Sequence, residues 1–151
     1  MTSQWHLSLA GCSPSGNRHY PNSASRLFEK SGNLGQARIV GESGVRCGVA
    51  HVFNVGSTAA IGTIEFEPGL QEDLPQVLDK LFPPSRDYGH EHAWHDGNGH
   101  SHLQATMLGP SLTVPIRDRK LVLGTWQQIF HLECDIKPRR RTIALTVMGD
   151  A

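Results

Sequence analysis

The sequence lacks the features that mark several broad classes of protein. Its 14 basic side chains balance 14 acidic ones over 151 residues, so no general attraction to nucleic acid or to an anionic membrane is expected. No apolar run approaches the roughly 20 residues of a membrane span. Residues 1–12 contain neither Lys nor Arg and only a short apolar run, so we expect no signal peptide there.

Cysteine is also scarce. The three cysteines, Cys12, Cys47 and Cys134, lie far apart, are odd in number and form no C-x-x-C motif. This spacing predicts no disulfide framework. A reducing compartment is the simple inference, so we expect a cytoplasmic protein.

The length and composition indicate a single turn-rich domain. A chain of 151 residues can bury a substantial core, and its 16 glycines and 38% hydrophobic content argue against a helical bundle. Residues 1–33 are rich in Ser, Asn, Gly and Pro and show no period of 2 or 3.6. We therefore predict a disordered or poorly packed tail over 1–33 and a folded domain over 34–151.

Hydrophobic periodicity and turn residues predict an α+β fold with a mainly antiparallel sheet and two or three short helices. Helices are expected over 36–44, with Gly44 as the residue that ends it, over 70–82, and over 102–109. In the second helix, Pro75 should fall in the first turn, or the helix should start later. Strands are expected over 45–55, 59–67, 112–116, 120–123, 127–135 and 142–148.

The most distinctive stretch covers residues 88–115. It holds five of the nine histidines together with an aspartate and an asparagine: His90, His92, His95, His100, His102, Asp96 and Asn98. We predict that His90, His100 and His102 bind one divalent metal with an open coordination position, the arrangement of a catalytic zinc site. Zinc is the first choice, with manganese or iron as the alternative. Asp96 would be a further ligand or would orient a histidine. The plainer interpretation is a solvated histidine-rich loop.

Other polar residues suggest a phosphate site. Ser111, Thr125 and Arg141 could hold phosphate oxygens, although turn chemistry and a solvated basic turn explain them equally well. Glu65 has a functional interpretation as a general base and a plain one as a solvated strand residue. Asp73 is expected on the polar side of its helix.

Three motifs resemble a known family. They are G-N-G-H-S-H-L at 97–103, L-G-T-W-Q-Q-I at 123–129 and R-R-R-T-I at 139–143. They are similar to the YjbQ-like family, whose members are labelled secondary thiamine-phosphate synthases. The resemblance runs from about residue 36 to 149. It implies a compact α+β domain, a homotrimer, and a site near the subunit interface with histidines and a bound metal.

By motif position, the resemblance assigns the family's histidines to His90 and His102 and its acidic residues to Glu65 and Asp73. It implies that a pyrimidine pyrophosphate and a thiazole phosphate are joined to give thiamine phosphate, with Mg²⁺ accompanying the pyrophosphate. The expected partner is thus a phosphorylated small molecule, with no nucleic acid and no membrane. One departure is Gly56, where family members commonly have His. This departure favours a non-catalytic metal- or ligand-binding trimer, and a metal-dependent phosphoester hydrolase would carry the same residues.

Overall fold

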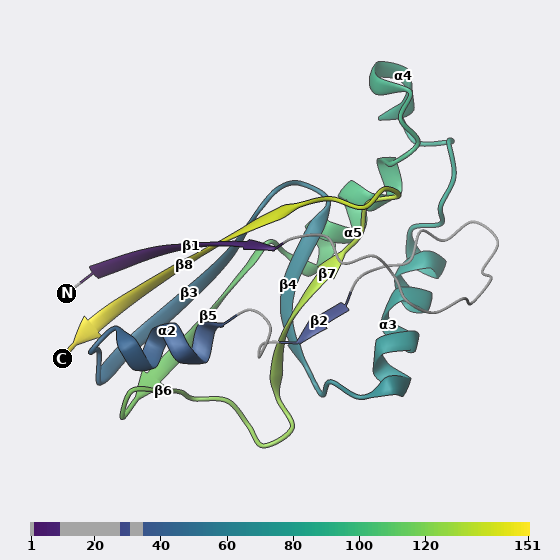
Figure 1. Cartoon of the computed structure of the whole chain (residues 1–151). Helices are drawn as coiled ribbons and strands as arrows, with labels where there is room; N and C mark the ends of the chain where they lie inside the picture. Colours follow the sequence, from purple (N-terminus) through teal and green to yellow (C-terminus); the bar gives the residue numbers. More distant parts are fainter. Residues whose placement is uncertain (1, 10–27, 31–34) are drawn as a thin grey trace.

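The computed structural model describes residues 2–9, 28–30 and 35–151, which form eight strands and four helices (Figure 1). In chain order they are β1 (Thr2–Leu9), β2 (Phe28–Lys30), α2 (Gln36–Glu42), β3 (Cys47–Val55), β4 (Ala59–Ile64), α3 (Pro68–Leu81), α4 (Glu91–Trp94), α5 (Gly99–Leu108), β5 (Ser111–Arg117), β6 (Lys120–Leu121), β7 (Gln128–Glu133) and β8 (Arg141–Asp150). Every strand pairing is antiparallel. The α+β class predicted from the sequence is therefore confirmed.

The strands form two sheets. The larger has the order β1-β8-β3-β5-β6, and the smaller has the order β2-β7-β4. In the larger sheet β8 lies between β1 and β3, with Val52 opposite Leu145. In the smaller sheet Ala59 lies opposite Glu133 at one end and Ile64 lies opposite Gln128 at the other.

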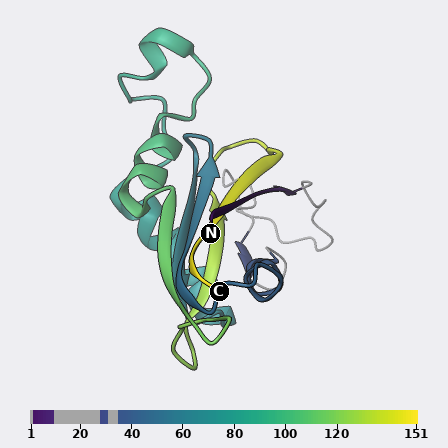
Figure 2. The ribbon, with the colours of Figure 1, turned by 90° about the vertical axis from the view of Figure 1, so that its left-hand side faces the viewer.

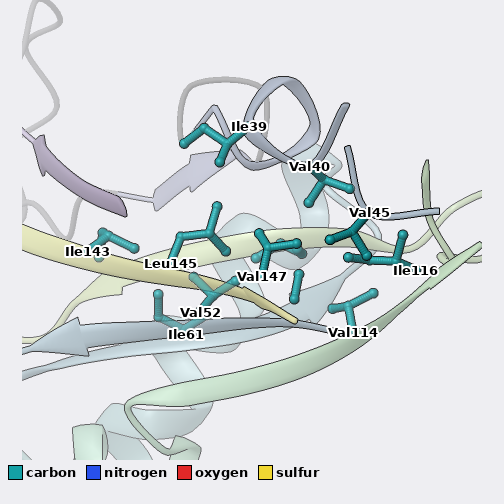
Figure 3. Packing of buried hydrophobic residues seen from close by; sticks show 12 residues of the cluster. Ile39, Val40, Val45, Val52, Ile61, Val114, Ile116, Ile143, Leu145 and Val147 are labelled. Atoms are coloured by element: carbon teal, nitrogen blue, oxygen red, sulfur yellow. The ribbon is translucent and has the colours of Figure 1, made fainter. Parts of the chain in front are cut away.

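The main core lies where one face of the larger sheet meets the smaller sheet and α2. Alternate residues of a strand point to the same face, and in β8 these are Ile143, Leu145 and Val147, all buried. They pack with residues of β3 and β5, with Ile61 of β4, and with Ile39 and Val40 of α2 (Figure 3). Figure 2 shows α2 on the opposite side of the sheets from α3 and α5.

A second apolar cluster fixes α3 and α5 to the smaller sheet. Leu78 of α3 and Ala105 of α5 pack with Phe130 and Leu132 of β7. Gln104 of α5 also donates hydrogen bonds to the carbonyl oxygens of Leu78 and Phe82. The longest described helix is α3, with 14 residues, and no helix in the described part of the chain is long and apolar enough to cross a membrane.

The start of α3 differs from the prediction because of its N-cap. The carboxylate of Glu67 accepts hydrogen bonds from the backbone N–H groups of Gly69 and Leu70. This cap starts the helix at Pro68, so Pro75 lies inside it rather than in its first turn. The strand expected over 59–67 ends earlier, at Ile64, so Glu65 lies outside it. The predicted end of α2 is confirmed, because Gly44 follows its C-cap with a φ of +79°.

The tail predicted over residues 1–33 lies mostly outside the described residues. Within it, however, Thr2–Leu9 pairs with β8 along its whole length and Phe28–Lys30 pairs with β7. These two strands lie within the segment predicted to be a disordered or poorly packed tail. The expected absence of a period of 2 in this segment was wrong for residues 5–9, because Trp5, Leu7 and Leu9 alternate with polar residues, a period typical of strands.

Candidate functional site

Three chain segments meet at one end of the molecule, which we call the α4 end. They are the β3–β4 turn (residues 56–58), the histidine segment (residues 86–102) and the β7–β8 loop (residues 134–140). The strand register places the first and third segments together, because Val55 lies opposite Thr142 and Ala59 opposite Glu133. Gly97 faces the side chain of Ile136 closely enough that an added Cβ would lie 3.7 Å from its Cδ1. Figure 1 shows α4 projecting beyond this end.

The projecting part of the histidine segment is held by its own polar contacts. Glu91 forms an ion pair with Arg86 and accepts a hydrogen bond from the backbone N–H of Gly97 at 2.8 Å. His95 and Gly97 adopt positive φ angles of 55° and 76°, which turn the chain back toward α5. Trp94 is left 71% exposed at the tip.

Two of the predicted metal ligands lie together. The rings of His90 and His102 have centroids 4.6 Å apart, and His90 Nε2 lies 3.3 Å from Asp96 Oδ1. Although this nitrogen is buried, it makes no hydrogen bond within the described part of the chain. Burial lowers the pKa of His102, as does the neighbouring His90, while Asp96 and Asp135 act in the opposite direction. His102 is therefore a neutral imidazole near pH 7, the form that binds metals.

The third predicted ligand, His100, has a different environment. It lies in the first turn of α5, is only 3% exposed, and packs its ring 6.2 Å from that of Tyr88. Since successive helix residues are rotated by about 100°, His100 and His102 point in different directions. Across residues 2–9, 28–30 and 35–151, no group of three or more His, Cys, Asp or Glu side chains is already arranged to hold a metal ion.

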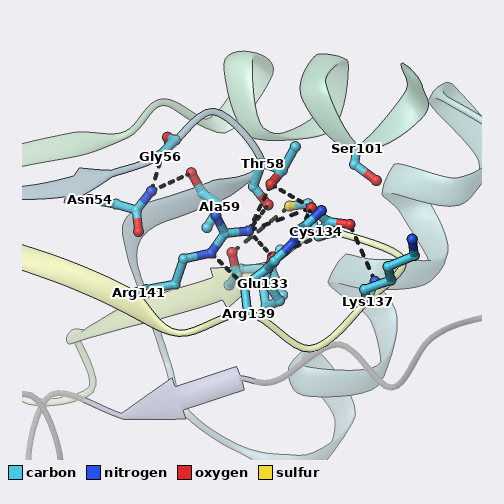
Figure 4. Close-up of polar contacts among 12 residues, drawn as sticks. Asn54, Gly56, Thr58, Ala59, Ser101, Glu133, Cys134, Lys137, Arg139 and Arg141 are labelled. Carbon is cyan, nitrogen blue, oxygen red and sulfur yellow. Dashed lines mark hydrogen bonds and ion pairs between the residues drawn. The ribbon is translucent and has the colours of Figure 1, made fainter. Parts of the chain in front are cut away.

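Beside the histidines lies a buried network of charges (Figure 4). Arg141 donates from Nε to Glu133 at 2.6 Å and from Nη2 to the Thr58 hydroxyl at 2.7 Å. The same hydroxyl donates to Asp135 at 3.0 Å, and Asp135 also accepts a hydrogen bond from Arg139. Burial by itself would raise the pKa of Asp135, but the hydrogen bonds from Arg139 and Thr58 outweigh it and lower that pKa.

A buried histidine extends this network toward the core. His131 of β7 is 2% exposed, and its Nε2 lies 3.2 Å from Asn54 Oδ1. Burial lowers the pKa of His131 to about 4, and the nearby Arg141 adds to the effect. His131 therefore stays neutral at physiological pH and serves as a hydrogen-bonded core residue.

Three of the remaining predicted site residues, Glu65, Asp73 and Thr125, lie away from the α4 end within one copy of the chain. Glu65 follows Ile64, at the opposite end of β4; the five residue steps from Ala59 to Ile64 span roughly 17 Å. Thr125 precedes β7 at that same far end, and Asp73 is exposed on α3. Ser111 starts β5 opposite Phe53. These positions leave the predicted roles of the four residues untested.

The sequence reasoning overlooked Thr58, Glu133 and Asp135. A signal existed, since Glu133 and Asp135 end an apolar strand and a run of arginines follows six residues after Glu133. Carboxylates at the end of a buried strand require a cation or hydrogen-bond donors. Arg141 was assigned to phosphate, but two of its three guanidinium nitrogens are occupied by Glu133 and Thr58.

Comparison with known proteins identifies the family. The family model described as "UPF0047 protein YjbQ-like" matches residues 36–150. A UPF0047 protein of Methanothermobacter thermautotrophicus is 41% identical over 111 residues, which cover 74% of this chain and 76% of that protein. YjbQ of Salmonella typhimurium is 30% identical over 114 residues, covering 75% and 82% of the two chains. The chain therefore belongs to the YjbQ-like UPF0047 family.

Solved structures agree with this assignment. A YbjQ-like protein of unknown function from Sulfolobus solfataricus superposes with a TM-score of 0.84 at 32% identity, covering 99% of each chain. A hypothetical protein from Aeropyrum pernix superposes with a TM-score of 0.78 at 27% identity, also over 99% of each chain. The three motifs in the sequence therefore predicted both the family and its fold.

Proposed function

We propose that the α4 end binds a divalent metal through His90, His102 and Asp96 and there receives a phosphorylated small molecule. The observation that carries the proposal is the buried His90 Nε2, which faces Asp96 Oδ1 at 3.3 Å without a hydrogen bond. Two ligand atoms that are each about 2.0–2.1 Å from a tetrahedral zinc ion lie about 3.3–3.4 Å apart. This one separation matches that of two zinc ligands, with Asp96 in place of the expected His100. Completing the site with His102 would require a rearrangement, because no three such side chains in the described part of the chain are already arranged around a metal ion.

The chain's own residues suit this role. His102 has a lowered pKa and offers a neutral ring beside His90. Asp96 supplies negative charge near His102, which favours a bound cation. A bound metal would polarise an oxygen of the phosphorylated substrate and stabilise charge on the departing group. Both histidines are half-buried as residues, although the His90 Nε2 atom is itself buried.

The reaction proposed is the transfer implied by the family resemblance, formation of thiamine phosphate. The bond between carbon and the pyrophosphate oxygen breaks, its electron pair leaves with pyrophosphate, and the thiazole nitrogen forms the new bond to that carbon. Purified metal-loaded protein would be assayed with both precursors and, separately, with generic phosphoesters. Thiamine phosphate together with released pyrophosphate is the expected result. Phosphate release from phosphoesters alone would indicate a hydrolase, and inactivity on every substrate would contradict both enzymes.

A second candidate is a non-catalytic metal- and ligand-binding protein that acts as a trimer. One observation favours it, since Glu65 lies far from the histidines within one copy. The family resemblance, which implies a histidine where this chain has Gly56, points the same way. Gly56→His would be compared with Gly56→Ala, because a side chain at this position, with a φ of +156°, would lie 2.9 Å from Arg141 Nη1. Activity that arises only in Gly56→His would identify the natural chain as the binding form.

A further inference from the structure

The β7–β8 loop carries an unusual concentration of positive charge for a protein with no net charge. Residues 137–141 contain four cationic side chains: Lys137, Arg139, Arg140 and Arg141. Asp135 pairs with Arg139, and Glu133 pairs with Arg141. In the described structure, neither Lys137 nor Arg140 has an ion-pair partner, and both are exposed.

The shape of this loop is fixed rather than left to solvent. Asp135 accepts hydrogen bonds from the backbone N–H of Lys137 at 3.2 Å, from Arg139 at 2.9 Å and from Thr58 at 3.0 Å. The loop is therefore anchored at its start to the β3–β4 turn, and at its end Arg141 is buried against Glu133. The two unpaired cations are presented from a preorganised loop, which reduces the entropy that a bound ligand would have to remove.

The loop also lies against the proposed metal site. Ile136 of the loop faces Gly97, the residue after Asp96, closely enough that an added Cβ on Gly97 would lie 3.7 Å from its Cδ1. Two uncompensated cations on a loop that contacts the histidine segment suit a ligand with several negative oxygens, because charge-assisted hydrogen bonds to phosphate are the strong ones. Asp135 and Glu133 are already occupied by arginines, so they do not cancel this charge.

We infer that Lys137 and Arg140 bind the phosphate or pyrophosphate group of the small-molecule substrate. This inference rests on the proposed function and names the part of the α4 end that recognises the anion. It replaces Arg141, Ser111 and Thr125 as the anion ligands. Arg141 instead has a positioning role, because it holds Glu133 and Thr58 in the network that fixes the loop.

Calorimetric titration with inorganic pyrophosphate, in the presence of a chelator, tests the inference without the metal. Lys137→Gln and Arg140→Gln should each weaken binding about tenfold, as expected for the loss of one charge-assisted contact. Lys120→Gln, which removes an exposed cation from the distant β5–β6 turn, is the matched control and should bind like the parent. Arg140→Lys keeps the charge and should retain most of the affinity.

The outcomes separate this inference from the proposed function. If Lys137→Gln and Arg140→Gln bind pyrophosphate as tightly as Lys120→Gln, or if the parent does not bind it, the inference is wrong. Binding of a short oligonucleotide through these two side chains, without binding of pyrophosphate, would also overturn it. Chelator-independent pyrophosphate binding by a parent that holds no metal would support the anion site while contradicting the metal site. Unchanged unfolding temperatures for both variants would exclude misfolding as the cause.

Discussion

The two ends of the smaller sheet carry polar residues of different kinds. At the α4 end, Glu133, Asp135 and Arg141 are buried and bonded to one another, and His90 and His102 lie beside them. At the far end, Glu65 and Thr125 are exposed. Burying a charged side chain without partners is costly. The buried charges of the α4 end therefore need specific ion pairs and hydrogen bonds, whereas the exposed polar residues of the far end do not. Within one copy of the chain, the buried and mutually bonded polar residues of the smaller sheet are therefore gathered at the α4 end.

The largest expected effect comes from removing the central cation. Arg141→Leu leaves Glu133 and Asp135 with less compensation in a buried site, and breaking a buried ion pair in this way costs about 3 to 5 kcal/mol. Glu65→Gln at the far end should change the free energy of unfolding by less than about 0.5 kcal/mol. Urea denaturation of both variants measures the difference. Equal stabilities for the two would remove the distinction between the ends.

The second expected effect is a dependence of folding stability on pH, which arises from His131 at the α4 end. The pKa of His131 is lowered from 6.5 in the unfolded chain to about 4 in the fold. The contribution of neutral His131 to the free energy of unfolding is therefore fully present above pH 6.5. It is lost as the pH falls toward 4, because over this range only the unfolded chain takes up the proton. The loss amounts to roughly 3 kcal/mol.

His131→Gln removes this titration and keeps an amide that can donate to Asn54. Denaturant unfolding between pH 7 and 4.5 should show a shallower loss of stability in the variant than in the parent. This range lies above the window in which Asp135, whose pKa is lowered from 3.8, loses its own contribution. Parallel pH profiles for the two proteins would contradict the account of His131 as a buried neutral residue.

A smaller effect is expected at the far end, where neighbouring glutamates differ. Glu67→Ala removes the N-cap of α3 and should cost about 1 kcal/mol. Glu65→Ala removes a side chain outside any strand or helix and should leave stability unchanged. Thermal unfolding of the two variants makes the comparison, and a larger loss for Glu65→Ala than for Glu67→Ala would reverse the assignment of the cap.

Local patterns in the sequence predicted most elements of the fold. Period-3.6 and Val-rich segments located α3 and β3, and Gly44 ended α2 as expected. The hydrophobic patterns did not predict a helix boundary that depends on one capping side chain. Glu67 starts α3 earlier than the apolar stripe suggests, because a cap acts through hydrogen bonds and leaves the hydrophobic period unchanged.

The candidate site was only partly predictable. The clustering of histidines pointed to His90 and His102, whose rings lie together in the structure. It could not separate them from His100, which is buried and packs against Tyr88. Spacing also grouped Arg141 with exposed arginines, although its partners are 8 and 83 residues away in the chain. Contacts between distant segments depend on the strand register, which residue types in one segment do not reveal.

The proposed function depends on a metal ion bound by His90 and His102 at the α4 end. Elemental analysis of dialysed parent, His102→Ala and His95→Ala proteins tests it most directly, since His95 belongs to the same segment but is exposed and outside the ring pair. We predict a stoichiometric divalent metal in the parent and in His95→Ala, and its loss in His102→Ala. Equal metal content in the two variants, or a parent without metal, would contradict the claim.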